Sequence, residues 1–274
     1  MRQIVSALAV RRLMFFLAAF LLVHGWADRA SADVRIVARE SGGADLVTMM
    51  KGGMVAIDIG DGVRMLRACA NDRLAFVNSA SGGIYWEGTL NELNEGLSQR
   101  IEQVFEEAGV GEADWMALMG LGLAQEVDVR VTRGEQVEVN GYETTYYLVE
   151  YRSGDGPWKT VEETWMSREL LEVVKEEVGD CYRQSYEIIG EIGNLMGLGM
   201  VEAAAVMTHP NYLDLYNQGV AVRSRSRLEL LGIVTEVEMQ IVEVTRDPLP
   251  DELFQIPEGY RRVDNPLAVF TGEL

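Results

Sequence analysis

The chain has 274 residues, with 43 acidic and 24 basic side chains and a formal net charge of −19 at pH 7. This acidity argues against nucleic acid as a partner, because phosphate binding requires concentrated positive charge. It also disfavours adhesion to anionic lipid headgroups, and solubility is its simplest explanation.

Residues 1–32 have the three-part pattern of a secretory signal peptide. An arginine-containing start precedes an apolar run at 13–23, and Ala30 and Ala32 are small residues of the kind that a signal peptidase recognises. The apolar run is shorter than the ~20 residues of a membrane span. We therefore expect cleavage, with a retained anchor as the alternative. The mature chain, 33–274, would be periplasmic or secreted and not an integral membrane protein, with a net charge of −22.

The first part of the mature chain predicts antiparallel strands. Apolar runs at 34–40, 46–60, 63–70 and 73–88 are interrupted or separated by Gly-Gly, Asn-Asp and Ser-Gly-Gly, which are typical of hairpin turns.

A helix is predicted next. Thr89 and Glu92 form a capping-box pattern, and apolar residues then recur at helical spacing from Leu90 to Ala108. We expect this amphipathic helix to end at Gly109 and to lie on a face of the sheet.

The middle of the chain predicts an antiparallel meander. Val127, Val129 and Val131 alternate with polar residues, and Asn140-Gly141 separates two alternating runs, which is a strong hairpin signal. Residues 168–207 predict a helical insert, whose many glycines indicate a broken or kinked helix.

A further hairpin is predicted after residue 219. With its turn at Leu231-Gly232, Arg227 faces Glu236 and Arg225 faces Glu238, while apolar Val222 faces Ile241 on the other side of the sheet. The stripe formed by Arg223, Arg225 and Arg227 is then a solvated sheet face, with an anion site as the alternative.

The stretch PLPDELFQIPEGYRRV, 248–263, predicts the closing piece of the domain. Pro248 and Pro250 end a strand because they lack ladder donors. Phe254 and Ile256 are expected to insert into the core, because leaving each in water costs about 1.5–3 kcal/mol.

Five segments, taken in order, resemble a bacterial family of exported proteins with a domain of unknown function. They are VNGYETTYYLVEY, EETWMS, HPNYLDLYNQGVAVRSRS, TEVEMQIVEV and the closing stretch. The resemblance covers 34–263, with its distinctive residues in 140–263. It implies the fold of LolA, the periplasmic lipoprotein carrier: a strongly curved antiparallel sheet, an incomplete barrel, with helices on its concave side.

The sequence offers little catalytic chemistry. His209 is the single histidine of the mature chain, so sites that need two histidines are excluded, and we expect it to be a loop element. The GLGLAQ stretch, 120–125, lacks the third glycine of a dinucleotide fingerprint. The DIGDG stretch, 58–62, lacks the ligand spacing of a calcium loop. We expect no cofactor and no metal.

Apolar binding is the stronger hypothesis, because tryptophan and methionine side chains are abundant and methionine adapts to varied apolar shapes. The candidate ligand-binding residues are Trp86, Trp115, Trp165, Met116, Met119, Met196 and Met200; packing in the core is the alternative for each. Cys69 and Cys181 either pair as a disulfide or remain two buried thiols.

We therefore expect a single α+β domain over 33–274, with a curved antiparallel sheet and helices covering its concave face. The expected function is a non-enzymatic exported carrier that holds an apolar ligand, a lipid or a lipoprotein acyl group, in the concavity. The alternatives are a fully packed structural or protein-interaction module of the cell envelope and, less favoured, a hydrolase that works with carboxylates alone. The sequence identifies no protein partner.

Overall fold

The computed structural model describes most of residues 33–274, which form one compact unit. The described residues are 33–43, 45–60, 62–108, 127–182, 184, 188, 205–230 and 233–271.

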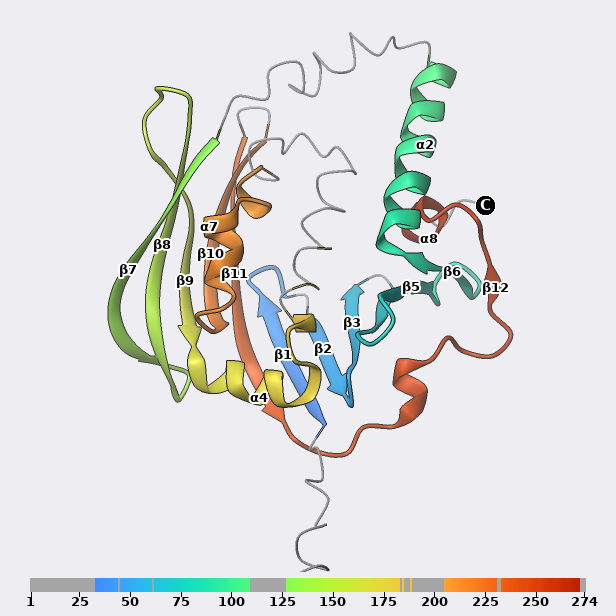
Figure 1. The fold of residues 1–274 in the computed structure, drawn as a ribbon, viewed down its shortest axis with the longest axis horizontal. Coiled ribbons are helices and arrows are strands. Elements are labelled where there is room, and N and C mark those ends of the chain that lie inside the picture. Colours follow the sequence, from blue (N-terminus) through green and yellow to red (C-terminus); the bar gives the residue numbers. More distant parts are fainter. Residues whose placement is uncertain are drawn as a thin grey trace, which may run out of the picture. The chain divides into compact units, whose positions relative to one another are not determined.

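A sheet of twelve strands dominates this unit (Figure 1). Their order across the sheet is β12-β6-β5-β4-β3-β2-β1-β11-β10-β9-β8-β7, so β12 and β7 are the edges and the sheet is not closed. The strands are β1 (Val34–Glu40), β2 (Asp45–Lys51), β3 (Met54–Gly60), β4 (Val63–Ala68), β5 (Arg73–Asn78), β6 (Ile84–Thr89), β7 (Val127–Val139), β8 (Tyr142–Ser153), β9 (Lys159–Ser167), β10 (Val220–Leu230), β11 (Ile233–Thr245) and β12 (Arg261–Arg262).

The sheet is mixed, which corrects the expectation of a purely antiparallel one. Ten of its strand pairs are antiparallel, but the two-residue strand β12 pairs with β6 in parallel, Arg261 opposite Ile84. This exception arises because β12 belongs to the closing stretch, which returns to the edge of the sheet after a long connection rather than through a hairpin.

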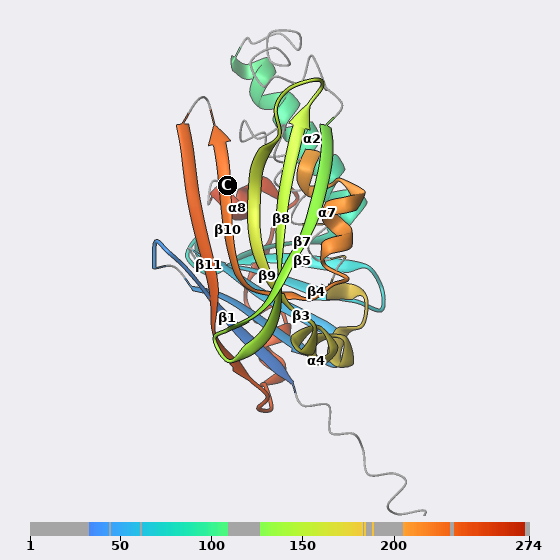
Figure 2. The same cartoon turned by 90° about the vertical axis from the view of Figure 1, so that its left-hand side faces the viewer.

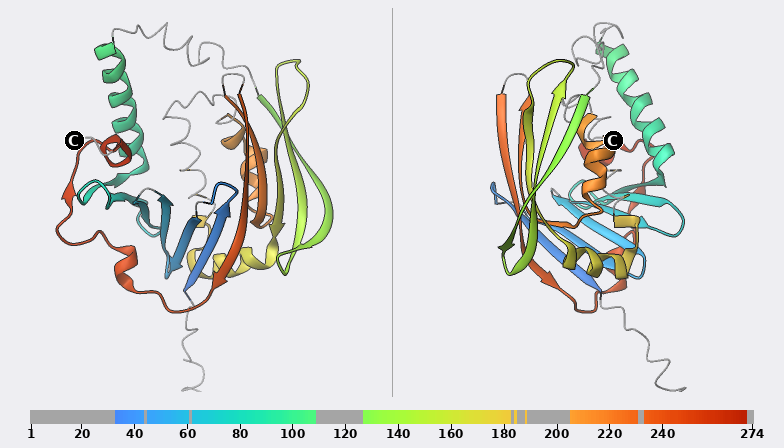
Figure 3. Two further views of the ribbon diagram at one scale, coloured as in Figure 1. Left: turned by 180° about the vertical axis from the view of Figure 1, so that it is seen from behind. Right: turned by 60° about the vertical axis from the view of Figure 1, so that its left-hand side comes forward.

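The sheet is curved. In Figures 1 and 3, β1, β2 and β3 lie between two groups of strands, β4–β6 on one side and β7–β11 on the other, which turn away from a common plane. Strand twist and β-bulges cause such bending, and bulges interrupt the pairing at Val37/Ala38 and at Ala221/Arg223. Figure 2 shows β7–β11 as long neighbouring strands.

The two faces of the sheet are distinguished by their residues. We call the face that carries Ile36, Ile57 and Val149 the inner face, and the face that carries Leu66 and Trp165 the outer face. Directly paired residues share a face in a sheet. The residue pairs between neighbouring strands therefore assign each strand from β6 to β8 its inner-face and outer-face residues.

The described helices are α2 (Leu90–Ala108), α4 (Arg168–Val178), the short α7 (Pro210–Leu215) and α8 (Leu267–Thr271), with a 3₁₀ turn η2 (Asp251–Phe254). Helix α4 contacts β1, β2, β8 and β10, α2 contacts β6 and α8, and α7 contacts β7. The predicted capping box is present: Thr89 N donates to Glu92 Oε2 (2.7 Å) and Glu92 N donates to Thr89 Oγ1 (3.3 Å). No helix in the described ranges is long and apolar enough to cross a bilayer. Most of the predicted insert, 168–207, lies outside the described residues.

The inner face carries the largest apolar cluster. Side chains of β1–β6, such as Met50, Met65 and Phe76, pack with Leu93 of α2 and Leu171 of α4. At the edge of this cluster Cys69 and Cys181 form a disulfide, with their Cα atoms 5.6 Å apart. Of the two states that the sequence left open for these cysteines, the structure has the paired one.

A second cluster lies on the outer face, under the closing stretch. Met49, Leu66 and Val77 of the sheet pack with Phe254 and Ile256. Arg261 N then donates to Gly83 O and Val263 N donates to Tyr85 O, so the stretch rejoins the sheet. The prediction that 248–263 closes the domain is confirmed.

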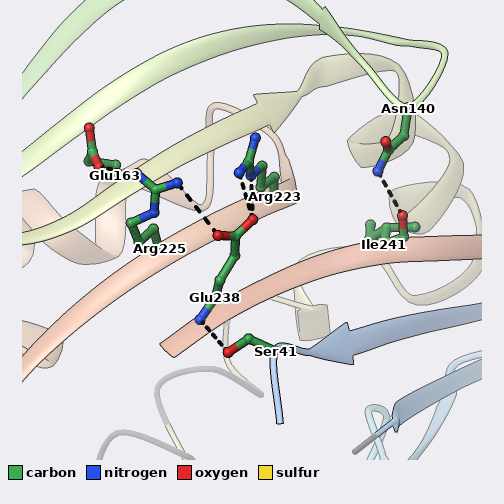
Figure 4. Close-up of polar contacts among 7 residues, drawn as sticks. All are labelled: Ser41, Asn140, Glu163, Arg223, Arg225, Glu238 and Ile241. Carbon is green, nitrogen blue, oxygen red and sulfur yellow. Dashed lines mark hydrogen bonds and ion pairs between the residues drawn. The ribbon is translucent and has the colours of Figure 1, made fainter. Parts of the chain in front are cut away.

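The hairpin predictions are also confirmed. Asn140 and Gly141 have positive φ (53° and 81°), as their two-residue turn requires, and Asn140 Nδ2 donates to Ile241 O at 3.0 Å (Figure 4). In the later hairpin Arg225 pairs with Glu238 and Arg227 with Glu236, in the register that charge pairing predicted.

Candidate functional site on the inner face of β7–β11

One row of inner-face residues crosses five strands. The pairing places Val131, Val149, Glu162, Ser226 and Val237 side by side, from β7 to β11. An acidic side chain thus stands in the middle of an otherwise apolar or small-residue row.

Some apolar side chains around this row are buried, such as Val149 and Val129, but others are only partly covered. Val127, Val131, Val237 and Met239 are half-buried, whereas Phe76 in the other half of the sheet is fully buried. The inner face of β7–β11 therefore presents apolar side chains that retain some accessible surface.

Glu162 is buried, with 8% of its surface exposed. The Tyr212 hydroxyl donates to its Oε2 atom at 2.7 Å, and the Tyr216 hydroxyl donates to that of Tyr212 at 3.3 Å. Burial raises the pKa of the Glu162 carboxyl, although hydrogen bonds from Tyr212 and Thr164 oppose the rise. Burial and the neighbouring Glu162 carboxyl hold the pKa of Tyr212 well above its usual value.

Helix α7 positions Tyr212 over the sheet. His209 caps the helix, since its Nδ1 atom accepts from Asn211 N (3.1 Å), and Pro210 occupies the first turn, where its missing N–H costs nothing. Asn211 Nδ2 donates to Val129 O at 2.8 Å, and Tyr212 and Leu215 pack against Val149 and Tyr147. The histidine expected in a loop thus lies just outside the helix, in an extended conformation, and caps its first turn.

The outer face of the same strands is a network of paired charges (Figure 4). Arg223 reaches Glu238 at 2.6 Å, and Arg225 lies 3.3 Å from Glu163 and 3.5 Å from Glu238. The Arg223 guanidinium also lies over the Trp165 ring, 5.1 Å from its centroid. Two of the three arginines of the stripe, Arg223 and Arg225, are therefore engaged by the protein's own carboxylates, which favours the solvated-face interpretation over an anion site.

Tyr146 connects the aromatic and acidic groups of the outer face. Its ring lies 5.3 Å from that of Trp165 and its hydroxyl donates to Glu163 Oε1 at 2.9 Å. Burial and this hydrogen bond to a carboxylate raise the pKa of Tyr146 to about 12.

A hollow of about 330 Å³ lies where the closing stretch meets β3, β4 and β5. Asp58 and Arg64 line it, together with Val77 and Tyr260. Two hydrogen bonds join Asp58 to Arg64, at 2.5 and 3.1 Å, so its charged groups satisfy each other.

The predicted ligand-binding residues are not brought together by the described part of the chain. Trp86 is on the inner face but packs against Phe76 in the core, with ring centroids 6.3 Å apart. Trp165 is on the outer face. The other five, Trp115, Met116, Met119, Met196 and Met200, lie outside the described residues. A ligand-binding role for this set stays a prediction.

Sequence reasoning missed Glu162, Tyr212, Val237 and Met239. The sequence does indicate that Val237 and Met239 lie on the apolar face of β11, since they alternate with Glu236 and Glu238. Nothing in the sequence distinguishes Glu162 from its neighbour Glu163. Among the described residues, no group of three His, Cys, Asp or Glu side chains is placed to hold a metal ion.

Comparison with known proteins gives distant structural likenesses. The chain is similar to the lipoprotein LppX of Mycobacterium tuberculosis, with 9% identity, 80% of this chain and 88% of that chain covered, and a TM-score of 0.31. It is similar to a DUF1329 family protein from Desulfovibrio piger (11% identity, 83% and 91% covered, TM-score 0.17). A putative outer membrane lipoprotein-sorting protein domain from Vibrio parahaemolyticus is a third (7% identity, 83% and 91% covered, TM-score 0.16).

No family model and no curated protein matches the chain. The likenesses include the two kinds of protein to which the sequence resemblance pointed, a domain-of-unknown-function family and a lipoprotein-sorting domain. Because their TM-scores lie below 0.5, they carry no argument about function, and the chain's own residues must supply it.

Proposed function

We propose that this chain is a non-enzymatic exported carrier that holds an apolar ligand, a lipid or the acyl group of a lipoprotein, against the inner face of β7–β11. The observation that carries this proposal is the set of half-buried apolar side chains on that face, Val127, Val131, Val237 and Met239. Each methylene of a ligand buried there would contribute about 0.8 kcal/mol.

The arrangement of the helices supports the same proposal. Helix α4 contacts strands of both halves of the sheet, and α7 packs on the inner face through Tyr212 and Leu215. Helices in these positions would cover the concave side of the curved sheet and shield a bound acyl chain from water. Displacement of a helix would admit and release the ligand.

A fully packed envelope module is the second candidate, and a specific observation favours it. The inner face of β1–β6 is filled by the protein's own side chains, including Phe76, Leu93 and Leu97, each with less than 2% of its surface exposed. If the same packing continued across β7–β11, the sheet would have no room for a ligand.

Native mass spectrometry of the mature chain, purified from the periplasm of an expression host, separates the two candidates. A carrier should retain lipid of defined mass, and an apolar fluorescent dye should bind and be displaced by added lipid. A bare protein mass together with no dye binding would support the packed module instead.

A variant pair locates the binding. Val237→Gln combined with Met239→Gln places amides on the inner face of β11, and we expect it to weaken dye binding about tenfold, since loss of 1.4 kcal/mol of apolar contact has that effect. Val242→Gln alters the same strand at a residue with 45% of its surface exposed and should leave binding unchanged. Equal effects of the two would contradict the inner-face site.

A further inference from the structure

The buried carboxyl of Glu162 lacks a cationic partner in the described structure. The groups that contact it are hydroxyls, from Tyr212 on α7 and Thr164 on the same strand. In the described part of the chain no lysine, arginine or histidine nitrogen lies within 4 Å of it, in contrast to Glu163 beside Arg225.

Such an arrangement is energetically unfavourable for an ionised carboxylate. A buried charge is normally paired, because transfer of an unpaired carboxylate out of water costs several kcal/mol. Two states relieve that cost: the carboxyl binds a proton, or a cation from outside the protein pairs with it.

The surroundings of Glu162 would fit a ligand that is apolar along its length and cationic at one end. Its neighbours in the row, Ser226 and Val237, are half-buried, so the row retains accessible surface on the side of β11. Apolar side chains flank it, and the oxygen of the Tyr212 hydroxyl is a further acceptor 2.7 Å from the carboxyl.

We infer that Glu162, together with Tyr212, binds a primary ammonium group carried by a long-chain lipid, whose acyl chain lies on the half-buried apolar residues of the inner face. An ammonium has three N–H donors and no acceptor, so the carboxylate and the tyrosine oxygen together satisfy two of them. This inference rests on the proposed function and names the chemistry of its ligand.

Charge also favours this ligand class. The mature chain has a net charge of −22, so an anionic headgroup is repelled, whereas an ammonium is attracted. A trimethylated ammonium retains the charge but has no N–H, so it should bind less well than a primary one. The ammonium could belong to an ethanolamine phospholipid or to a lipopeptide with a free amine next to its acyl chains.

Two matched ligand pairs test the inference on the wild-type mature protein. Phosphatidylethanolamine is compared with phosphatidylcholine of the same acyl chains, and a diacylated lipopeptide with a free terminal amine is compared with its N-acetylated form. Displacement of an apolar fluorescent dye gives the affinities. We expect at least one free-amine ligand to bind about tenfold more tightly than its matched partner, and the pair that shows this identifies the source.

Variants of two adjacent residues then test whether the preference for the free amine depends on Glu162. Glu162→Gln keeps an acceptor for Tyr212 and should retain acyl binding while losing the preference for the amine. Glu163→Gln, on the outer face, should keep that preference. Should the first variant fold poorly, the comparison of ligand pairs on wild-type protein still decides the inference.

The outcomes are distinct. Equal binding within both pairs, or a preference that survives Glu162→Gln in a folded protein, would overturn the ammonium site while the carrier function stood. Failure of every lipid to displace the dye, or of the dye to bind, would overturn the carrier function and the ammonium site together.

Discussion

Glu162 and Glu163 are neighbours in sequence and have opposite environments. Glu162 points to the inner face, where burial raises its pKa and its contacts are hydroxyls. Glu163 points to the outer face, where it accepts a hydrogen bond from Tyr146 and pairs with Arg225. Because successive side chains of a strand face opposite sides, one residue step changes a charge from a solvated network to an apolar layer.

The difference indicates how the two faces are used. The outer face of β7–β11 carries charges that balance one another, and surface pairs of this kind contribute little to stability. The inner face carries mainly apolar side chains and the buried Glu162 carboxyl, which has no cationic partner among the described residues. Changes on the inner side should therefore have large effects, and changes in the outer charge network should have small ones.

Removal of the disulfide on the inner side should have the largest effect. Cys69 and Cys181 are 112 residues apart, and closing a loop of that length stabilises a protein by about 5 kcal/mol in the chain-entropy account. Cys69→Ser combined with Cys181→Ser should lower the free energy of unfolding by about this amount in a urea titration. A loss below about 1 kcal/mol would show that the pair is not formed in the native protein.

Phe254→Ala should have the next largest effect. It tests the apolar cluster under the closing stretch, where the outer face is buried rather than solvated. Phe254 joins the closing stretch to the apolar cluster on β2–β5 and has 8% of its surface exposed. Its truncation should cost about 3 kcal/mol, measured by urea denaturation. Glu252→Ala, in the same turn but exposed, is the control and should cost less than about 0.5 kcal/mol. Similar values for the two would mean that the stretch is not part of the core.

Glu162→Ala should cost about 2 kcal/mol, because it leaves the buried Tyr212 hydroxyl without its acceptor. Glu162→Gln keeps an acceptor and should cost less. If Glu163→Ala destabilised the protein as much as Glu162→Ala in the same urea titration, the contrast between the faces would be wrong.

The pH dependence of Glu162→Gln has a definite sign. Because the pKa of Glu162 is raised in the folded state, the stability that its protonated form contributes is complete below its unfolded pKa. That stability is lost as the pH rises through the folded pKa. The stability of the Gln variant relative to wild type should therefore increase with pH above about 4.3 and then level off. A difference independent of pH, or one that falls, would contradict the assignment.

The smallest effect is expected for Arg225→Ala on the outer face. Its contacts to Glu163 and Glu238 are partly exposed, so the loss should be below about 1 kcal/mol. The loss should also shrink when the salt concentration is raised. Thermal melting at low and high salt measures both; a large, salt-independent loss would make this network part of the structural core.

Local signals in the sequence predicted much of the fold. The Asn140-Gly141 turn requires positive φ at two positions, which few other pairs adopt. The β10–β11 register follows from opposite charges on one face and apolar residues on the other. Phe254 and Ile256 are large apolar residues whose exposure to water is unfavourable, and both pack on the sheet together with Leu249, Leu253 and Tyr260.

The candidate site could not be predicted in the same way. In β9 the choice of face for Glu162 and Trp165 depends on register, and bulges at Val149/Glu150 and Ala221/Arg223 shift the pairing on both sides of this strand. The partner that makes burial of Glu162 tolerable, Tyr212, is 50 residues away. The parallel strand β12 likewise depends on where a long connection returns.

The most direct test of the central claim is to map where an acyl chain lies. A lipid with a photoreactive group in its acyl chain, bound to a protein of residues 33–274 and cross-linked by light, can be located by peptide mass spectrometry. The account predicts labels on Val237, Met239 and their inner-face neighbours on β7–β11. Labels confined to outer-face residues such as Trp165 and Tyr146, or no saturable labelling, would contradict it.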